Sequence, residues 1–147
     1  PSVIQINEII IGISNFEYFE EIKQQSNFEK KGITPVLNSI LKQRNFYPLI
    51  PFKSEEGIQK SSIIEYTQLD KLQFLDVIPD LFIYTNKNLA YAKSHHKSLF
   101  IHPGCICPST GSMKGTYVRF FAYPNTKFTG LDVINRIKVE KVVIEQQ

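Results

Sequence analysis

A short apolar run, LFIYT at residues 81–85, constrains the fold more than any other feature of this sequence. It follows a Pro79-Asp80 pair and contains no charged residue. Strands covered on both faces have such continuous apolar runs, whereas strands covered on one face alternate apolar and polar residues. We therefore predict a buried strand here. The place of Asp80 at the start of that strand favours a turn or cap role over ligand binding.

Further strands are predicted near both ends of the chain. Residues 3–13 are dense in β-branched side chains, and Asn7 and Glu8 interrupt them like a tight connection. This pattern predicts two buried strands joined by a turn, the second of which continues through Gly12 and Ile13. In residues 136–144 one alternate face is mainly apolar and the other mainly charged, which suits the outer surface of a sheet. Strands are also predicted at residues 99–101 and 116–123.

A first helix is predicted directly after the second strand. Ser14 and Glu17 have the spacing of an N-terminal capping box, and the helix should continue to about Gln25. Its apolar positions at helical intervals are Phe16, Phe19 and Ile22.

A second helix has a clearer start signal. Thr34 is expected as the N-cap and Pro35 at the first helical position, because proline suits a position whose N–H needs no partner. Lys42 and Arg44 are expected in the last turn, where cations are favoured by the helix dipole. The apolar face is formed by Val36, Leu37, Ile40 and Leu41.

The following segment is less regular. Pro48 and Pro51 predict an extended path over residues 45–52. We expect Tyr47, Pro48 and Leu49 to fasten the helix end onto the sheet; the alternative is that they help to form a surface for a partner. Residues 53–57 are typical of an exposed loop, and residues 61–69 fit either a strand or an irregular segment.

Composition places the chain in the ordinary globular range. It has 147 residues, of which 42% are hydrophobic and 21% charged, about the length of one domain. Strands alternating with helices at the front and antiparallel strands at the back predict an α/β or α+β sandwich. No apolar run approaches the roughly 18 residues of a membrane span, and the N-terminus lacks a signal-peptide pattern, so a soluble intracellular protein is expected. The net charge of +3 comes with scattered lysines, a weak hint of nucleic-acid binding.

The histidines and cysteines predict no metal centre. His102 follows the apolar strand at residues 99–101, as a ligand histidine does in dinuclear phosphoesterases, but such sites need several Asp, His and Asn ligands. His95 and His96 are adjacent, and on a strand they would point to opposite faces, so we expect a solvated turn there. Cys105 and Cys107 are too close in sequence for an ordinary disulfide and too few for a zinc site, so free thiols, buried or semi-exposed, are expected.

The aromatic residues of the segment 116–123 have two interpretations. Phe120, Phe121 and Tyr123 could stack on single-stranded bases, but core packing is the preferred prediction. Arg119 fits either an exposed strand position or an ion-pair anchor.

The ordered series of these signals is similar to a known family. The segment Ile6-Asn7-Glu8 leads through Gly12 to a helix start at Ser14-Asn15, and the later helix leads to the extended stretch at residues 46–51. A Pro-Asp strand, a loop at residues 101–104, a strand at residues 116–119 and a closing strand at residues 136–144 follow. In this order they resemble the C-terminal part of the B subunits, the second-largest and non-catalytic subunits, of DNA polymerase alpha-primase.

This resemblance implies a calcineurin-like metallophosphoesterase sandwich whose metal site is lost. Residues 1–147 would form its C-terminal part, with the OB-fold domain and the N-terminal region outside this chain. The implied function is a nuclear scaffold in DNA replication. It would bind the C-terminal module of the polymerase catalytic subunit and tether it to the primase subunits in a hetero-oligomer, with DNA contacted indirectly or weakly and no membrane. No catalytic, cofactor-binding or metal-binding residue is assigned.

His102 departs from the family pattern, which has asparagine there, and the CICPSTGSMKG segment is longer and less basic than usual. We therefore carry over no binding residue in that loop. Two alternatives stay open: an active metallophosphoesterase with His102 as one ligand, and the equivalent non-catalytic subunit of DNA polymerase delta or epsilon.

Overall fold

The structure is a computed structural model in which two compact units are distinguished. One unit holds residues Pro1–Ser2 and Tyr18–Ile78, and the other holds Val3–Glu17 and Pro79–Gln147. Each is described by itself below. The structure describes residues 1–15, 22, 32–48, 66–85, 90–107, 114–124 and 133–144.

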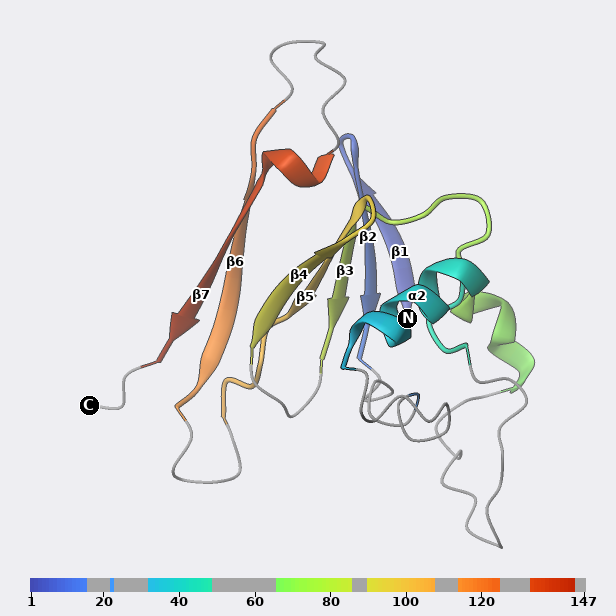
Figure 1. Cartoon of the computed structure of the whole chain (residues 1–147), viewed down its shortest axis with the longest axis horizontal. Coiled ribbons are helices and arrows are strands. Elements are labelled where there is room, and N and C mark those ends of the chain that lie inside the picture. Colours follow the sequence, from blue (N-terminus) through green and yellow to red (C-terminus); the bar gives the residue numbers. More distant parts are fainter. Residues whose placement is uncertain are drawn as a thin grey trace, which may run out of the picture. The chain divides into compact units, whose positions relative to one another are not determined.

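The larger unit is built on a five-stranded sheet (Figure 1). Strand β3 lies at its centre and pairs in parallel with β2 on one side and β5 on the other. Strand β4 pairs antiparallel with β5, and β1 lies at the opposite edge beside β2. The strands are β1 (Ser2–Ile6), β2 (Ile9–Ser14), β3 (Leu81–Tyr84), β4 (Tyr91–His95) and β5 (Ser98–His102).

The central strand confirms the prediction from the apolar run. Leu81, Phe82 and Tyr84 are all buried, and they point to alternate faces of the sheet. On one face, Leu81 packs in a cluster with Ile11, Leu99 and Ile101. On the other, the ring of Phe82 stacks on the ring of Phe100, with centroids 4.6 Å apart and an interplanar angle of 3°. Both faces of β3 therefore carry apolar packing, which explains why its sequence does not alternate.

Asp80 holds together three strands at the point where β3 begins. Its backbone N–H donates to the carbonyl of Ile10 at 2.9 Å, and its Oδ2 accepts the N–H of Ile10 at 2.9 Å. Its carbonyl accepts the N–H of Leu99 at 2.7 Å. Asp80 therefore has a structural role, but not the predicted turn or cap role: its carboxylate satisfies a backbone donor of β2, which is distant in sequence.

Strands β6 (Thr116–Ala122) and β7 (Ile137–Val143) form a two-stranded antiparallel ribbon. The short 3₁₀ helix η3 (Val133–Arg136) directly precedes β7. Both strands were predicted. Val118, Ile137 and Val139 pack against the buried cluster of the five-stranded sheet, so the apolar face of β7 lies where its alternation placed it. The described part of the chain is thus a mixed, sheet-rich α/β structure, and the packing of the ribbon on the five-stranded sheet is compatible with a sandwich.

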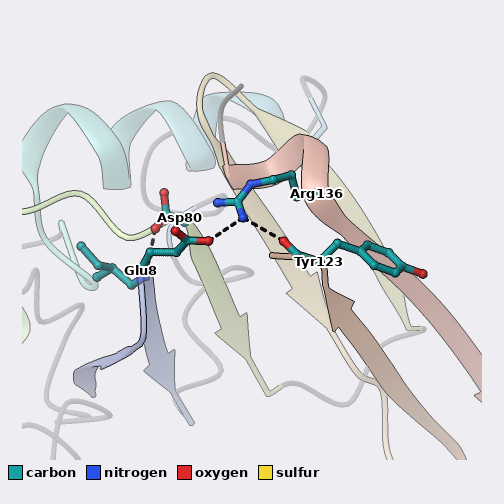
Figure 2. Close-up of polar contacts among 5 residues, drawn as sticks. Glu8, Asp80, Tyr123 and Arg136 are labelled. Carbon is teal, nitrogen blue, oxygen red and sulfur yellow. Dashed lines mark hydrogen bonds and ion pairs between the residues drawn. The ribbon is translucent and has the colours of Figure 1, made fainter. Parts of the chain in front are cut away.

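Arg136 ties the ribbon to the turn between β1 and β2 (Figure 2). Its Nη1 lies 2.5 Å from Oε1 of Glu8 and donates to the carbonyl of Tyr123 at 2.8 Å. The Arg136 side chain is 11% exposed and that of Glu8 is 51% exposed, so only the arginine side of this ion pair is shielded from water. The turn itself is at Asn7 and Glu8, as predicted, and Asn7 has a φ of +53°, a conformation that asparagine tolerates.

Two burial predictions are wrong in this unit. Strand β1 was expected to be buried, but it is the edge strand of the sheet and its side chains are all exposed. Phe120, Phe121 and Tyr123 were expected in the core, but all three are exposed. Adjacent strand residues point to opposite faces, so Phe120 and Phe121 could not both face the same core.

The smaller unit contains helix α2 (Thr34–Gln43) and the 3₁₀ segment η2 (Tyr66–Leu72). The predicted helix is confirmed, but its start is shifted: Ile33 is the N-cap, and Thr34 is already helical. Arg44 was expected in the last turn and instead ends the helix in the left-handed region, with a φ of +47°. The buried positions of the apolar face are Val36, Leu37 and Ile40, while Leu41 is half-buried.

The end of α2 is anchored by η2 within the same unit. The N–H of Phe46 donates to the carbonyl of Leu72 at 2.8 Å, and the N–H of Phe74 donates to the carbonyl of Arg44 at 3.0 Å. The Phe46 and Phe74 rings meet edge to face at 5.1 Å. The segment after the helix is therefore a packed connection, and Tyr47 in it is buried. Its predicted attachment to the sheet stays a prediction. Where residues 61–69 are described, from Tyr66 on, they form η2 and not a strand.

Several predictions lie outside the described residues. They are the first helix apart from Ile22, which is helical and buried, and the segment at residues 49–65. Ser14, expected to begin that helix, is the last residue of β2. Over the part of the chain that is described, no helix is long and apolar enough to cross a membrane.

Candidate functional site

The loop that follows β5 is the candidate site, because it carries His102 at the strand end. The His102 side chain is fully buried, and its ring stacks on Tyr91 of the neighbouring strand at 5.2 Å. Its Nδ1 accepts the N–H of Gly104 at 3.3 Å, a contact that fixes the direction of the chain as it leaves the strand. Nε2 has no hydrogen-bond partner among the described residues.

The loop is held by close backbone contacts. Gly104 has a φ of +78°, and a Cβ there would lie 2.0 Å from Oγ1 of Thr116. That hydroxyl donates to the carbonyl of Pro103 at 3.1 Å, and the Thr116 N–H donates to the carbonyl of Cys105 at 2.9 Å. The loop is therefore fastened to the start of β6. Cys105 is half-buried and Cys107 is exposed, and both are free thiols, as the spacing predicted.

The other predicted candidates lie at the opposite end of the same strands. Strands β4 and β5 pair with Tyr91 opposite His102 and His95 opposite Ser98, so His95 is separated from His102 by the length of the hairpin. His96 is in the turn, exposed and with a φ of +51°, which confirms the predicted solvated turn. In the parallel pair of β3 and β5, Leu81 lies opposite Leu99, so Asp80 is also at the end away from His102.

These positions decide what the site can do chemically. Among the described residues, no three His, Cys, Asp or Glu side chains gather closely enough to hold a metal ion. The carboxylate of Asp80 and Nδ1 of His102 both accept backbone N–H groups. Each side chain thus stabilises the local backbone at its own end of the sheet by accepting a hydrogen bond.

Burial lowers the pKa of His102, and a hydrogen bond with its own backbone opposes this only in part. The pKa of His95 is also lowered, by burial first and then by the charges of His96 and Lys93. In both cases the folded protein favours the neutral imidazole, and the unfolded chain binds the proton more readily.

The lowered histidine pKa predicts that the folded protein loses stability on acidification. As the pH falls through the ordinary histidine value of about 6.5, the unfolded state takes up protons that folded His102 does not. The free energy of unfolding should then fall by at most about 1.4 kcal/mol per pH unit for each such group. We expect His102→Phe, which keeps a planar ring against Tyr91, to flatten this dependence, as measured by urea unfolding at several pH values from 7.5 to 5.5.

The matched control for this prediction is His96→Asn. It removes an exposed imidazole at a position whose positive φ asparagine tolerates. Because His96 makes only a secondary contribution to the lowered pKa of His95, His96→Asn should change the pH dependence less than His102→Phe does. An identical slope in wild-type protein and His102→Phe would show that His102 does not couple folding to pH.

Sequence reasoning preferred the wrong interpretation for one surface in this unit, the side of the β6–β7 ribbon that faces away from the five-stranded sheet, because it favoured core packing for Phe121 and Tyr123. Tyr117, Phe121 and Tyr123 are exposed there. The signal that could have found it is the pair of adjacent aromatic residues at 120–121, since a strand sends one of the two outward.

Comparisons with known proteins match the chain to one family. The model of the DNA polymerase alpha/epsilon B-subunit family matches residues 1–93. The B subunit of DNA polymerase alpha from Mus musculus is 26% identical over 125 residues, covering 82% of this chain and 20% of the relative. The subunit of the same name from Schizosaccharomyces pombe is 23% identical over 128 residues, covering 84% and 22%.

A third relative, the B subunit of DNA polymerase alpha from Saccharomyces cerevisiae, is 24% identical over 148 aligned positions, covering 81% of this chain and 21% of the relative. The chain therefore spans about a fifth of the length of these curated relatives. The family match covers more than half of the chain. The chain belongs to the DNA polymerase alpha/epsilon B-subunit family.

Proposed function

We propose that this chain is part of a non-catalytic scaffold subunit of DNA polymerase alpha-primase in the nucleus. It binds the C-terminal module of the polymerase catalytic subunit and tethers it to primase for the initiation of DNA replication. Membership of the B-subunit family supports this proposal, as do the names of the three relatives, each of which is a B subunit of DNA polymerase alpha.

The proposal includes an architecture for the domain. Residues 1–147 are the C-terminal part of a calcineurin-like phosphoesterase domain that has lost its metal site, and the OB-fold domain lies outside this chain. The parallel centre of the five-stranded sheet and the second sheet packed against it support a sandwich of this kind. The coverage of about a fifth of each relative supports its assignment to one part of a larger subunit.

The observation that carries the scaffold proposal is that the two candidate residues at strand ends both have structural roles. Asp80 and His102 lie at opposite ends of the parallel pair β3 and β5, and each accepts a hydrogen bond from a backbone N–H. Groups that hold the fold together in this way contribute to a rigid surface. A permanent complex on such a surface commonly buries well above about 2,000 Å².

Affinity purification of the tagged full-length subunit tests the proposed assembly. We expect the catalytic subunit of polymerase alpha and the primase subunits to be recovered together in stoichiometric amounts. Recovery of the delta or epsilon catalytic subunit without primase would reject the alpha assignment.

The non-catalytic part of the proposal has its own test. The purified full-length subunit is assayed for phosphodiester hydrolysis with Mn²⁺ and for bound metal. We expect no turnover above the background of the His102→Ala variant. Bound metal together with turnover that is lost in His102→Ala would overturn this part.

A further inference from the structure

The ribbon of β6 and β7 has an outer face that carries no core packing. Val118 and Val139 pack on the five-stranded sheet, and alternate residues must point the other way. Directly opposed residues of an antiparallel pair share a face, and the register places Tyr117 opposite Val142, Arg119 opposite Glu140 and Phe121 opposite Lys138. We call these six residues, together with Tyr123 where the strand ends, the outer face of the ribbon.

Aromatic rings on this face are exposed in a row. The exposed fractions are 37% for Tyr117, 44% for Phe121 and 56% for Tyr123. The N–H of Tyr123 donates to the carbonyl of Arg136 at 2.9 Å, so the row continues in register, and Figure 2 shows its ring directed away from the Arg136–Glu8 ion pair. Same-face residues along a strand are about 6.6 Å apart per step. Tyr117, Phe121 and Tyr123 are spaced four and two residues apart, so their rings form an open stacking surface along one strand.

Positive charge is concentrated on the same ribbon. The described ribbon segments, residues 114–124 and 133–144, contain five Lys or Arg residues and one Glu, a net charge of +4. The whole chain has a net charge of only +3, so the remainder of the chain has a net charge of −1. Because Arg136 is paired with Glu8, the exposed excess on the ribbon is carried by Lys114, Arg119, Lys138 and Lys141 against Glu140.

The outer face keeps part of that charge. Nζ of Lys138 lies 2.8 Å from Oε1 of Glu140, and Nη2 of Arg119 lies 3.2 Å from Oε2. Two cations share one carboxylate, so the face remains net positive. Both cationic side chains are more than half exposed, and they lie on the same face of the ribbon as the aromatic rings.

We propose that the outer face of the ribbon binds single-stranded nucleic acid. Bases stack on Tyr117, Phe121 and Tyr123, and phosphates pair with Arg119 and Lys138. Aromatic platforms interleaved with cations suit a flexible strand of negatively charged phosphates and flat bases. Aromatic residues and arginine are also enriched at protein interfaces, so the net positive charge of the face is what favours nucleic acid over a protein partner. This binding goes beyond the proposed scaffold function, and either can fail without the other.

Fluorescence anisotropy with a labelled 20-nucleotide oligothymidylate and the full-length subunit tests the proposal. Loss of one stacking ring costs about 1–3 kcal/mol, so Phe121→Ala should weaken binding about 5- to 100-fold. Phe121→Tyr should restore it, because the ring is kept. Arg119→Gln and Lys138→Gln should each reduce the salt dependence of binding.

Phe120→Ala is the matched control. It removes the same ring from the adjacent residue, which is 37% exposed but on the face turned toward the sheet, and it should change the affinity by less than about twofold. Thermal unfolding of each variant separates loss of binding from loss of fold. Absence of oligothymidylate binding at low salt, or equal losses in Phe120→Ala and Phe121→Ala, would overturn the proposal. So would a Phe121→Ala variant that keeps its oligothymidylate affinity and no longer binds the polymerase catalytic subunit.

Discussion

Phe100→Ala is expected to lower the free energy of unfolding by about 3–5 kcal/mol, the range for removal of a buried phenylalanine. The Phe100 side chain is 0% exposed and lies on β5, which pairs directly with the central strand. Its ring stacks on Phe82 at 4.6 Å and on Tyr84 at 6.0 Å. Removing it leaves a cavity that close-packed neighbours fill only in part. The change is measured by urea unfolding of the purified protein.

Phe121→Ala is the matched control for that prediction. It deletes the same ring from a strand position that is 44% exposed, so much less buried area is lost and the free energy of unfolding should fall by less than about 1 kcal/mol. Equal effects of the two substitutions would mean that the rings on the central strands do not form the core.

Gly104→Ala should lower the free energy of unfolding by about 2–5 kcal/mol, through two additive causes. A non-glycine residue in the left-handed region costs about 1–2 kcal/mol. The new Cβ would also lie 2.0 Å from Oγ1 of Thr116 and 3.2 Å from Cβ of Ala90. Relieving these contacts moves the threonine hydroxyl away from Pro103 and loosens the loop after His102, at a further cost of about 1–3 kcal/mol.

Gly32→Ala separates these two causes. Gly32 has a similar φ of +69°, but a Cβ there would have no heavy atom within 4 Å. It should show the backbone cost alone, about 1–2 kcal/mol. If Gly104→Ala were no more destabilising than Gly32→Ala, as judged by the urea midpoints, the inference that the loop approaches β6 closely would be contradicted.

Much of the sheet could be predicted from the sequence because burial leaves a direct pattern in it. The uninterrupted apolar residues of β3 and the alternation of β7 each reflect how many faces are covered. Helix α2 was also predictable, since Pro35 and the apolar spacing agree. Its exact start was not, because Ile33 adopts a helical conformation that its side chain does not indicate.

What the sequence could not indicate depends on contacts between distant residues. Strand β1 is rich in β-branched residues, as β2 is, and only the strand order makes it an edge. Arg44 ends its helix in a left-handed conformation, where its Nη1 donates to the carbonyl of Leu75. Phe121 and Tyr123 are exposed because Val118 and Val139, on the other face of the ribbon, pack against the sheet.

The candidate site shows the same division. Local sequence was enough to predict that His95 and His96 form a turn and that Asp80 has a structural role. The distance of these residues from His102 required the register of β3, β4 and β5. The internal hydrogen bond of His102 with Gly104 required the loop geometry after the strand.

The central claim is that this chain belongs to a subunit that holds a polymerase by a protein interface. The most direct measurement is the molar mass, by light scattering after gel filtration, of the purified full-length subunit mixed with the isolated C-terminal module of the polymerase alpha catalytic subunit. The account predicts a single peak with the mass of a one-to-one complex. Two separate peaks, each with the mass of a free protein at micromolar concentration, would contradict it.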